Sequence, residues 1–487
     1  MRRALPNDEG TSRASAPGGE RGQYDVIVIG AGPTGENVAD RAVRGGLTAA
    51  IVESELVGGE CSYWACMPSK ALLRPVAAVR EASHVQGVEG ARLVPADVLK
   101  RRDSFTHNWK DDSQADWVKN AHIDLFRGHG RLAGERRVSV GETELTARHA
   151  VVVATGTRAI VPPVLAGVNP WTSREATSAL AVPGRLAIVG GGVVACEMAA
   201  AWQALGARVT LLARGGLLER LPGFAGDLVA DGLREAGVDV RLRASVTAAE
   251  RGGFAGGADG GFLEGDAVTL TLDDGTVLEA DAVLAATGRA PHTDDIGLRA
   301  AGLEPGSWLD VDDTMRVRNV SGGWLYAAGD VNHLALLTHM GKYQGRIAGD
   351  AIAARARGAE PAVTDRSSRT CVPQVVFTVP EVAAVGRTPA EAERDGIRTR
   401  VVEYDIGNVA GAALFADGYA GKAQMVVDED RKTLVGVTLA GPGTGEMIHA
   451  ATIAVASEAT LETLWHAVPS YPTISEVWLR LLETYGM

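Results

Sequence analysis

Short apolar runs that break into glycine-rich turns dominate the hydrophobic pattern of this chain. The run at 24–29 leads into such a turn, then into a helical stretch over 36–45 and a second apolar run at 48–52. Apolar runs without polar alternation are typical of strands buried on both faces of a parallel sheet. The run at 185–189 leads into a second glycine-rich turn, a helix and a strand at 208–212. The sequence therefore predicts two βαβ units.

The last part of the chain has a different pattern. From about residue 365, strand-like segments at 374–378, 422–427 and 433–439 are followed by helical stretches, which predicts an α+β domain. The glycine-rich segment 251–266 predicts a flexible hairpin tip within the second βαβ region. The predicted fold class is therefore α/β, with two Rossmann-like dinucleotide-binding domains and a C-terminal α+β domain.

Composition places the chain among soluble globular proteins. Its 487 residues are 46% hydrophobic and 22% charged, and no apolar run approaches the length of a membrane span. The net charge of −12 argues against nucleic acid and against an anionic membrane surface as partners. Residues 1–22 are polar and rich in Gly, Ser and Pro, which predicts a disordered tail rather than a signal peptide. With only four cysteines, a disulfide-stapled secreted scaffold is excluded, so we expect a cytoplasmic protein.

The two glycine-rich turns carry the spacing of dinucleotide-binding loops. They read Gly30-x-Gly32-x-x-Gly35 and Gly190-x-Gly192-x-x-Ala195. Glycines at these positions permit the tight turn and the close approach of a pyrophosphate to a helix N-terminus. One such loop is weak evidence, but two in strand–turn–helix context predict two bound dinucleotides.

The residue that ends the second strand of each unit predicts which dinucleotide binds there. Glu53 lies 23 residues after Gly30 and suits a ribose diol. The same step in the second unit reaches Ala213, which is followed by Arg214 and, on the next loop, Arg220. Two arginines favour a 2′-phosphate, although both also fit an ordinary solvated surface. We therefore expect FAD in the first unit and NADPH in the second, with NADH still possible.

Small residues elsewhere mark further points of close approach to a cofactor. Strands at 151–154, 283–286 and 325–328 each break into a turn of small residues. The Asp330 carboxylate, which follows the last of these, suits a ribityl hydroxyl. The additional candidate cofactor contacts are Gly59, Gly130, Thr155, Gly156, Gly288, Gly329 and Asp330.

Two of the four cysteines, Cys61 and Cys66, are separated by four residues within the segment Gly58–Lys70. Next to a flavin, such a pair can cycle between dithiol and disulfide. The alternative is two buried cysteines that happen to lie close together. We interpret Cys196 and Cys371 as buried structural residues, and we assign no metal site.

These motifs, in this order and spacing, resemble those of the FAD-dependent pyridine nucleotide–disulfide oxidoreductases of class I. That family includes dihydrolipoamide dehydrogenase, glutathione reductase, mercuric reductase and soluble transhydrogenase. Its Gly-Gly-x-Cys-x4-Cys-x-Pro-Ser-Lys element matches Gly58–Lys70. The resemblance implies a homodimer with interleaved active sites. The implied domains are a discontinuous FAD-binding domain at 23–170 and 290–360, an NAD(P)H-binding domain at 171–289 and a dimerisation domain at 365–487.

The resemblance also implies roles for particular residues. Cys66 corresponds to the charge-transfer thiol that faces the flavin, and Cys61 to the interchange thiol that attacks substrate. Lys70 corresponds to a lysine near the flavin N5 that pairs with Glu197. Thr338 and the neighbouring His339 are implied as backbone contacts to the flavin. Val193 stands where the family often has a tyrosine lid over the nicotinamide, which implies a less gated site.

The chain departs from the family pattern near its C-terminus. Disulfide reductases carry His-Pro-Thr-x-Ser-Glu there, with the His as acid/base and the Glu orienting it. This chain has Tyr471 in place of that His and keeps Glu476. A phenol with a pKa near ~10 is a poor proton shuttle, and losing acid/base help typically costs roughly 10²–10⁴ in rate. His466, five residues earlier, is an alternative source of that help.

The function predicted first is an FAD-dependent NAD(P)H oxidoreductase. Electrons pass from NADPH through FAD and the Cys61–Cys66 disulfide to a small-molecule acceptor that needs little proton help, such as a quinone, a metal ion or an activated disulfide. Dihydrolipoamide dehydrogenase of a 2-oxo acid dehydrogenase complex is an alternative, although Ala213 and Tyr471 speak against it. A redox-sensing flavoprotein that turns over slowly is a third.

Overall fold

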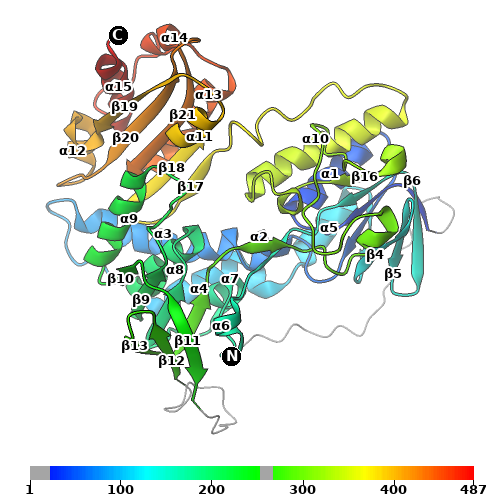
Figure 1. Cartoon of the computed structure of the whole chain (residues 1–487), viewed down its shortest axis with the longest axis horizontal. Helices are drawn as coiled ribbons and strands as arrows, with labels where there is room; N and C mark the ends of the chain where they lie inside the picture. The colour runs from blue at the N-terminus through cyan, green and yellow to red at the C-terminus, as the bar shows by residue number, and fades with distance from the viewer. Residues whose placement is uncertain (1–21, 253–266) are drawn as a thin grey trace.

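The structure is a computed structural model, which describes residues 22–252 and 267–487. Nearly all of the predicted N-terminal tail, 1–21, and most of the predicted hairpin tip, 253–266, lie outside the described residues. Figure 1 shows three sheet-centred parts that meet along the helices α3 (Cys66–Ser83) and α4 (Pro95–Phe105). No helix in the described ranges is long and apolar enough to cross a membrane.

The first βαβ unit lies within a mixed sheet in the order β3-β2-β1-β6-β5-β4, with β16 paired to β6. β1, β2, β3, β6 and β16 run parallel, and every residue of β1 from Val26 to Ile29 is buried. Helices α1 and α10 pack against each other beside the sheet (Figure 1). The bounds are β1 Gln23–Ile29, α1 Pro33–Arg44, β2 Ala49–Glu53, α5 Asp112–Asn120, β3 Ile123–Arg127, β4 Gly130–Gly134, β5 Arg137–Val140, β6 Thr143–Val153, β16 Leu325–Ala327 and α10 Thr338–Ala356.

The second βαβ unit forms a parallel sheet in the order β10-β9-β8-β14, and the antiparallel strands β11-β12-β13 lie between β10 and β14 in sequence. Helix α8 is buried along most of its length between this sheet and α3. The bounds are α6 Pro163–Ala166, α7 Ser173–Ser178, β8 Arg185–Val189, α8 Val193–Ala204, β9 Arg208–Ala213, α9 Gly223–Glu235, β10 Asp239–Leu242, β11 Val246–Arg251, β12 Val268–Leu272, β13 Val277–Ala280 and β14 Ala282–Ala285. The strand β7 (Thr157–Ala159) pairs with β15 (Arg289–Pro291) between the two units.

The C-terminal part is an antiparallel sheet in the order β17-β18-β21-β20-β19. All of β21 is buried, and helices α13 and α15 contact this sheet, which forms the separate lobe of Figure 1. The bounds are β17 Gln374–Val376, β18 Glu381–Gly386, α11 Pro389–Arg394, β19 Thr399–Asp405, α12 Ala410–Phe415, β20 Lys422–Asp428, β21 Thr433–Gly441, α13 Ile448–Ala456, α14 Leu461–Trp465 and α15 Val477–Tyr485. The predicted α+β architecture of this part is therefore confirmed.

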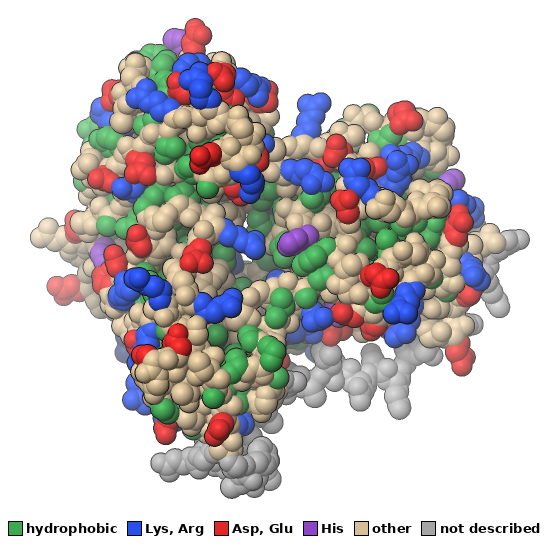
Figure 2. All heavy atoms as spheres, in the orientation of Figure 1, with side chains coloured by type: hydrophobic (Ala, Val, Ile, Leu, Met, Phe, Trp, Pro, Cys, Tyr) green, Lys and Arg blue, Asp and Glu red, His purple; other side chains and the backbone are tan. Residues whose placement is uncertain are grey.

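Charge is spread over the surface rather than gathered into a field of one sign. Figure 2 shows Lys and Arg side chains interspersed with Asp and Glu over the visible face, although the net charge of the chain is −12. A long-range electrostatic steering surface is therefore not a feature of this face.

Candidate active site

The two cysteines of the Gly58–Lys70 segment lie at the junction of two helices. Cys61 is in the short helix α2 (Gly59–Tyr63), and Cys66 is the first residue of α3. Both thiols are half-buried and free in this structure. The Cys66 Sγ lies 3.2 Å from the Thr338 hydroxyl at the start of α10. Because Cys66 sits at the N-terminus of an 18-residue helix, the positive end of the helix dipole favours its thiolate.

The pKa values of the two thiols are shifted in opposite directions. A hydrogen bond from Cys61 lowers the pKa of Cys66, and the Thr338 hydroxyl and the charge of Lys70 lower it further. The pKa of Cys61 is raised, first by its hydrogen bond to Cys66 and then by burial. The first proton to leave the reduced pair therefore comes from Cys66, while Cys61 stays a thiol.

The predicted ion pair between Lys70 and Glu197 is present. The Lys70 ammonium, one helical turn after Cys66 on α3, donates to the Glu197 carboxylate on α8 at 2.8 Å. The other Glu197 oxygen accepts the backbone N–H of Phe377 at 3.0 Å, and the Phe377 ring lies 4.8 Å from the ammonium. Glu197 is 3% exposed, so both its oxygens are satisfied inside the protein.

The first glycine-rich loop leaves no space for side chains where it turns. Gly30 has a φ of +104°, and a Cβ there would lie 2.5 Å from the Ala154 carbonyl oxygen. A Cβ on Gly35 would lie 1.9 Å from the Gly30 oxygen. Gly59 has a φ of +58° and would place a Cβ 2.9 Å from Gly32 Cα. The N-termini of α1 and α2 therefore converge with bare backbone, which is the cradle that a pyrophosphate needs.

Polar side chains around this cradle fit FAD. The Glu53 carboxylate accepts the N–H groups of Ala31 and Glu55 at 2.7 and 2.8 Å, and its burial raises its pKa. Asp330 is also buried, which raises its pKa, and it accepts the Thr157 hydroxyl at 3.1 Å. The hydroxyl of Thr155 is buried without a hydrogen-bond partner among the described residues. An unpaired buried hydroxyl at this position suits a polar group of the cofactor.

The remaining glycines that were predicted to contact the first dinucleotide are of two kinds. A Cβ on Gly130 would lie 3.0 Å from Ile29 and Val52 side chains, and one on Gly329 would lie 2.7 Å from the Thr34 hydroxyl. These glycines allow protein groups to pack closely. Gly156 opens into free space and Gly288 meets only the tip of Ile160 at 3.6 Å, so both leave room for a ligand.

The second glycine-rich loop makes the same tight turn, but the space in front of its helix is less crowded. Gly190 has a φ of +142°, and a Cβ there would lie 2.2 Å from the Ala286 oxygen. A Cβ on Gly192 would meet nothing within 4 Å, and Ala195 is fully buried in α8. Val193 is 37% exposed at the helix start. The space in front of this helix is therefore free for a dinucleotide.

The end of β9 carries the predicted specificity residues. Ala213 is fully buried, whereas Arg214 and Arg220 are exposed. The carboxylate of Glu219, on the same loop, accepts the Gly216 N–H at 2.8 Å and so stabilises its own loop.

Tyr471 and Glu476 are not joined within one chain. The Tyr471 side chain is 76% exposed on the C-terminal domain, and His466 is also exposed. One Glu476 oxygen accepts a guanidinium N–H of Arg480 at 2.6 Å. Its other oxygen is buried and has no partner among the residues that the structure describes. Glu476 is therefore free to hold one more donor.

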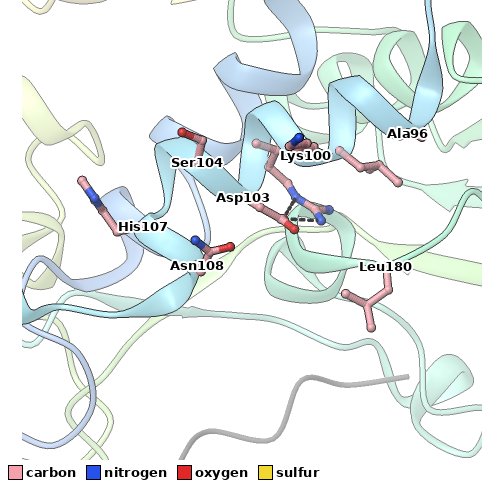
Figure 3. A pocket seen from close by; sticks show the side chains of 9 residues that line it. Ala96, Lys100, Asp103, Ser104, His107, Asn108 and Leu180 are labelled. Atoms are coloured by element: carbon pink, nitrogen blue, oxygen red, sulfur yellow. Dashed lines mark hydrogen bonds and ion pairs between the residues drawn. The ribbon is translucent and has the colours of Figure 1, made fainter.

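The other two cysteines and one surface cavity lie apart from this site. Cys196 is fully buried and Cys371 is 5% exposed, and burial raises the pKa of both thiols. A cavity of about 680 Å³ runs along α4, and none of the predicted site residues lines it (Figure 3). There the buried Arg102 donates to Asp103 and to the Ala179 carbonyl, which ties α4 to the second βαβ unit.

The charged groups around the cysteines were not predicted from the sequence. Glu60 and Trp64, inside the cysteine segment, contact Arg174 of α7. Burial raises the pKa of Glu36 on α1 to about 7, against the opposing charge of Lys342 on α10. Residues this far apart in the chain give no local pattern. A charged residue directly before a redox cysteine was the one available signal.

Fold and site together define a flavin-dependent reductase with a redox-active dithiol next to one of two dinucleotide sites. The chain belongs to the pyridine nucleotide-disulphide oxidoreductases, whose family pattern it matches over residues 24–377. Residues 372–481 match the dimerisation domain of the same family. The protein is therefore an FAD- and pyridine nucleotide-dependent oxidoreductase that forms homodimers.

Relatives across the family are similar over nearly the whole chain. The chain is 30% identical to a dihydrolipoyl dehydrogenase of Chlamydia muridarum, covering 93% of this chain and 95% of the relative. It is 31% identical to a glutathione reductase of Burkholderia cepacia, with 94% and 98% covered. It is 32% identical to a mercuric reductase of Shigella flexneri, with 96% and 82% covered. The HOCl-induced flavoprotein disulfide reductase RclA from Escherichia coli, at 22% identity, has the same fold, with a TM-score of 0.79 over 95% of this chain and 99% of RclA.

Proposed function

We propose that this enzyme uses NADPH to reduce a small-molecule acceptor through Cys61 and Cys66. The observation that carries the proposal is the Cys66 thiol, which the Cys61 hydrogen bond, Thr338 and Lys70 together hold toward its thiolate form. A stable thiolate next to a flavin site suits electron transfer, whereas a fully buried neutral thiol does not. Acceptors that need little proton help, namely a quinone, a metal ion or an activated disulfide, fit the absence of the family histidine.

Reduction of the Cys61–Cys66 disulfide takes two electrons and one proton. The FAD that the first cradle would hold would supply two electrons, which come from the nicotinamide as a hydride. With those electrons and one proton, the Cys61–Cys66 S–S bond breaks into a thiol on Cys61 and a thiolate on Cys66. Lys70 stabilises the negative charge, and Glu197 keeps Lys70 in place. When two electrons pass to the acceptor, the S–S bond forms again and the proton is released.

The residues proposed to hold FAD are those around the first cradle. The backbone of Gly30, Gly32 and Gly35 would receive the pyrophosphate, Glu53 the adenosine ribose, and Asp330 and Thr155 the flavin side. Burial raises the pKa of both carboxyl groups, so each gains from hydroxyl donors.

NADPH is the proposed donor because the second site offers cations and no acid for the ribose. Ala213 has no group that could hold a diol, and Glu219 is occupied by its own loop. Arg214, Arg220 and Arg243 are exposed, and the Arg243 backbone is bonded to the Gly215 carbonyl at 3.3 Å. These arginines suit a 2′-phosphate.

We expect kcat/KM to be roughly 10–100-fold higher for NADPH than for NADH, since a charge-assisted contact contributes about 1.5–3 kcal/mol. Arg214→Ala should remove most of this preference by raising the KM for NADPH alone. Arg208→Ala, an exposed arginine at the other end of β9, is the matched control and should leave the preference unchanged. Equal kcat/KM for the two nucleotides in the parent enzyme would contradict the proposal.

Tyr471 is proposed to line the acceptor site of the partner subunit. Apolar side chains are unusually exposed around it, with Val468 at 84% and Leu414 at 72%. A cavity of about 400 Å³ lies alongside, between α12 and residues 472–475. Exposed apolar surface on a dimerisation domain is what a partner subunit covers.

We expect Tyr471→His to increase disulfide reduction at least tenfold, because one buried oxygen of Glu476, which has no partner among the described residues, can orient an imidazole. Tyr471→Phe should reduce turnover of the native acceptor only slightly. Steady-state rates of both variants, with FAD content and dimerisation checked, test this. A loss beyond roughly 10³-fold in Tyr471→Phe would show that the phenol itself transfers the proton.

An acceptor panel tests the proposal as a whole. NADPH oxidation is followed with a quinone, a thiol-reactive metal ion and an aromatic disulfide, and the expected result is rapid oxidation with at least one of them. Dihydrolipoamide-dependent reduction of NAD at a comparable rate would instead favour the activity named for the dihydrolipoyl dehydrogenase relatives. Slow turnover with every acceptor would favour redox sensing.

A further inference from the structure

The segment that leads into the second βαβ unit contacts residues 55–66, here called the cysteine loop, through one arginine. Arg174, in α7, donates two hydrogen bonds to the Glu55 carboxylate at 2.9 and 2.7 Å. Its Nε donates to the Glu60 carboxylate, which belongs to the residue directly before Cys61. Its guanidinium lies 4.3 Å from the ring of Trp64, which is 6% exposed. One side chain therefore holds the loop on both sides of Cys61.

A second contact from α7 fixes the same loop. The Thr177 hydroxyl, one turn after Arg174, donates to the backbone carbonyl of Trp64 at 3.1 Å. The helix itself begins with a capping box at Thr172. The backbone N–H and the hydroxyl of Thr172 both donate to the Glu175 carboxylate, at 2.8 and 2.7 Å. The loop is thus attached to a helix whose own start is well defined.

The same helix is attached to the second βαβ unit. Trp171, three residues before Arg174, bonds the carbonyl of Val283 at 2.7 Å and accepts from Ala285 at 2.8 Å, both in β14. Its ring lies 5.8 Å from that of Trp202 on α8. A rigid path of a few residues therefore connects the proposed nicotinamide domain with the cysteine loop.

The Glu60 carboxylate lies between two arginines. Arg174 bonds one oxygen, and Arg289 approaches the other at 3.5 Å while also donating to the Thr157 hydroxyl and carbonyl at 2.6 and 2.7 Å. Because Glu60, Arg174 and Arg289 are each only partly exposed, their charges are incompletely screened by water. The negative charge of the Glu60 carboxylate is therefore balanced by the two guanidinium groups.

We propose that Arg174 is a positioning residue that sets the reactivity of Cys61, by neutralising Glu60 and by tying the cysteine loop to the nicotinamide-binding part of the chain. The inference rests on the proposed function in one respect, namely that Cys61 is the thiol that meets the acceptor. Without Arg174, the negative charge of Glu60 would disfavour a thiolate at Cys61, and the loop would lose its anchor.

The other charged and titratable groups near Cys61 are known from the structure. Cys66 on α3 and Lys342 on α10 act directly on the Cys61 thiol. The charge of Glu60 raises the pKa of Asp330, and the charge of His292 lowers the pKa of Glu55. Replacing Arg174 removes a donor from both Glu55 and Glu60, so a change in Cys61 reactivity reports the loss of Arg174. Replacing Glu60 separates the Glu60 contact from the Glu55 contact.

The test is the pH dependence of Cys61 alkylation in the FAD-loaded Cys66→Ser enzyme, into which each variant below is introduced. In that enzyme no Cys66 thiolate competes for the reagent or raises the pKa of Cys61. Alkylation by iodoacetamide is followed by mass spectrometry of the Cys61 peptide. Arg174→Met should move the midpoint upward by about one pH unit, a tenfold loss of thiolate below the midpoint. Arg185→Met is the matched control, since Arg185 also bridges two carboxylates, Asp281 and Glu279, and it should leave the midpoint unchanged.

Two further variants keep the inference falsifiable. Glu60→Gln should move the midpoint downward, and the double variant Glu60→Gln/Arg174→Met should return it to near the parent value. If Arg174→Met matches Arg185→Met, or if Glu60→Gln leaves the midpoint unchanged, the inference is overturned. If Arg174→Met does not fold, the Glu60→Gln result alone decides. Alkylation needs neither NADPH nor acceptor, so failure of the proposed function would appear only in turnover.

Discussion

Replacing Cys66 with serine should abolish reduction of any acceptor that depends on the dithiol, with a loss of roughly 10³-fold or more, because no S–S bond can form or break. The thiolate favoured by Cys61, Thr338 and Lys70 disappears with the Cys66 sulfur. The long-wavelength thiolate-to-flavin absorption band of the two-electron-reduced enzyme should vanish as well. Cys61→Ser should lose the same activity but keep the band, since Cys66 remains.

Anaerobic reductive titration of the two variants, followed by absorbance, is the measurement. Cys371→Ser is the matched control, because Cys371 is buried elsewhere and its thiol donates to the Thr452 carbonyl. That variant should titrate like the parent enzyme. Unchanged titrations in both Cys61→Ser and Cys66→Ser would mean that the pair is structural and that the chemistry uses the flavin alone.

Much of the fold could be predicted because it depends on local sequence. The apolar runs at 24–29 and 185–189 appear as β1 and β8, and each glycine-rich loop forms the expected turn at the start of a helix. Buried parallel strands and dinucleotide turns restrict the residues at consecutive positions, so a single chain carries their signal. The Lys70–Glu197 pair was instead expected from the family resemblance, because no local pattern connects residues that lie 127 positions apart.

Contacts between distant segments could not be predicted in this way. Arg174 meets Glu55 and Glu60 from more than a hundred residues away, and no periodicity connects them. The same holds for the Thr338 hydroxyl, which was expected to offer only its backbone and in fact contacts Cys66. Tyr471 was predicted from its motif, and its side chain is 76% exposed in the single chain. Such features arise from tertiary packing, which overrides local preference.

The Lys70–Glu197 pair allows a prediction that joins stability to redox chemistry. Lys70→Met would leave the Glu197 carboxylate buried, with the Phe377 N–H as its one remaining donor within 22–252 and 267–487. Breaking a buried pair costs about 3–5 kcal/mol. Because the Lys70 side chain is 35% exposed, solvent screening reduces the expected loss of unfolding free energy to about 2 kcal/mol. Lys422→Met, which removes an exposed pair with Glu403, is the matched control and should cost less than about 1 kcal/mol.

The same substitution should also change the titration of Cys66. Its thiolate exists above its pKa and is lost as the pH falls through that value. Lys70 lowers the pKa and Glu197 raises it, so Lys70→Met removes the favourable charge and leaves the unfavourable one. The pH at which the thiolate-to-flavin band falls to half should therefore rise by about 1–2 units. Glu197→Gln combined with Lys70→Met should reverse most of this shift and return the midpoint toward that of the parent enzyme. If the band of Lys70→Met titrates as in the parent while its stability falls, the lysine is purely structural.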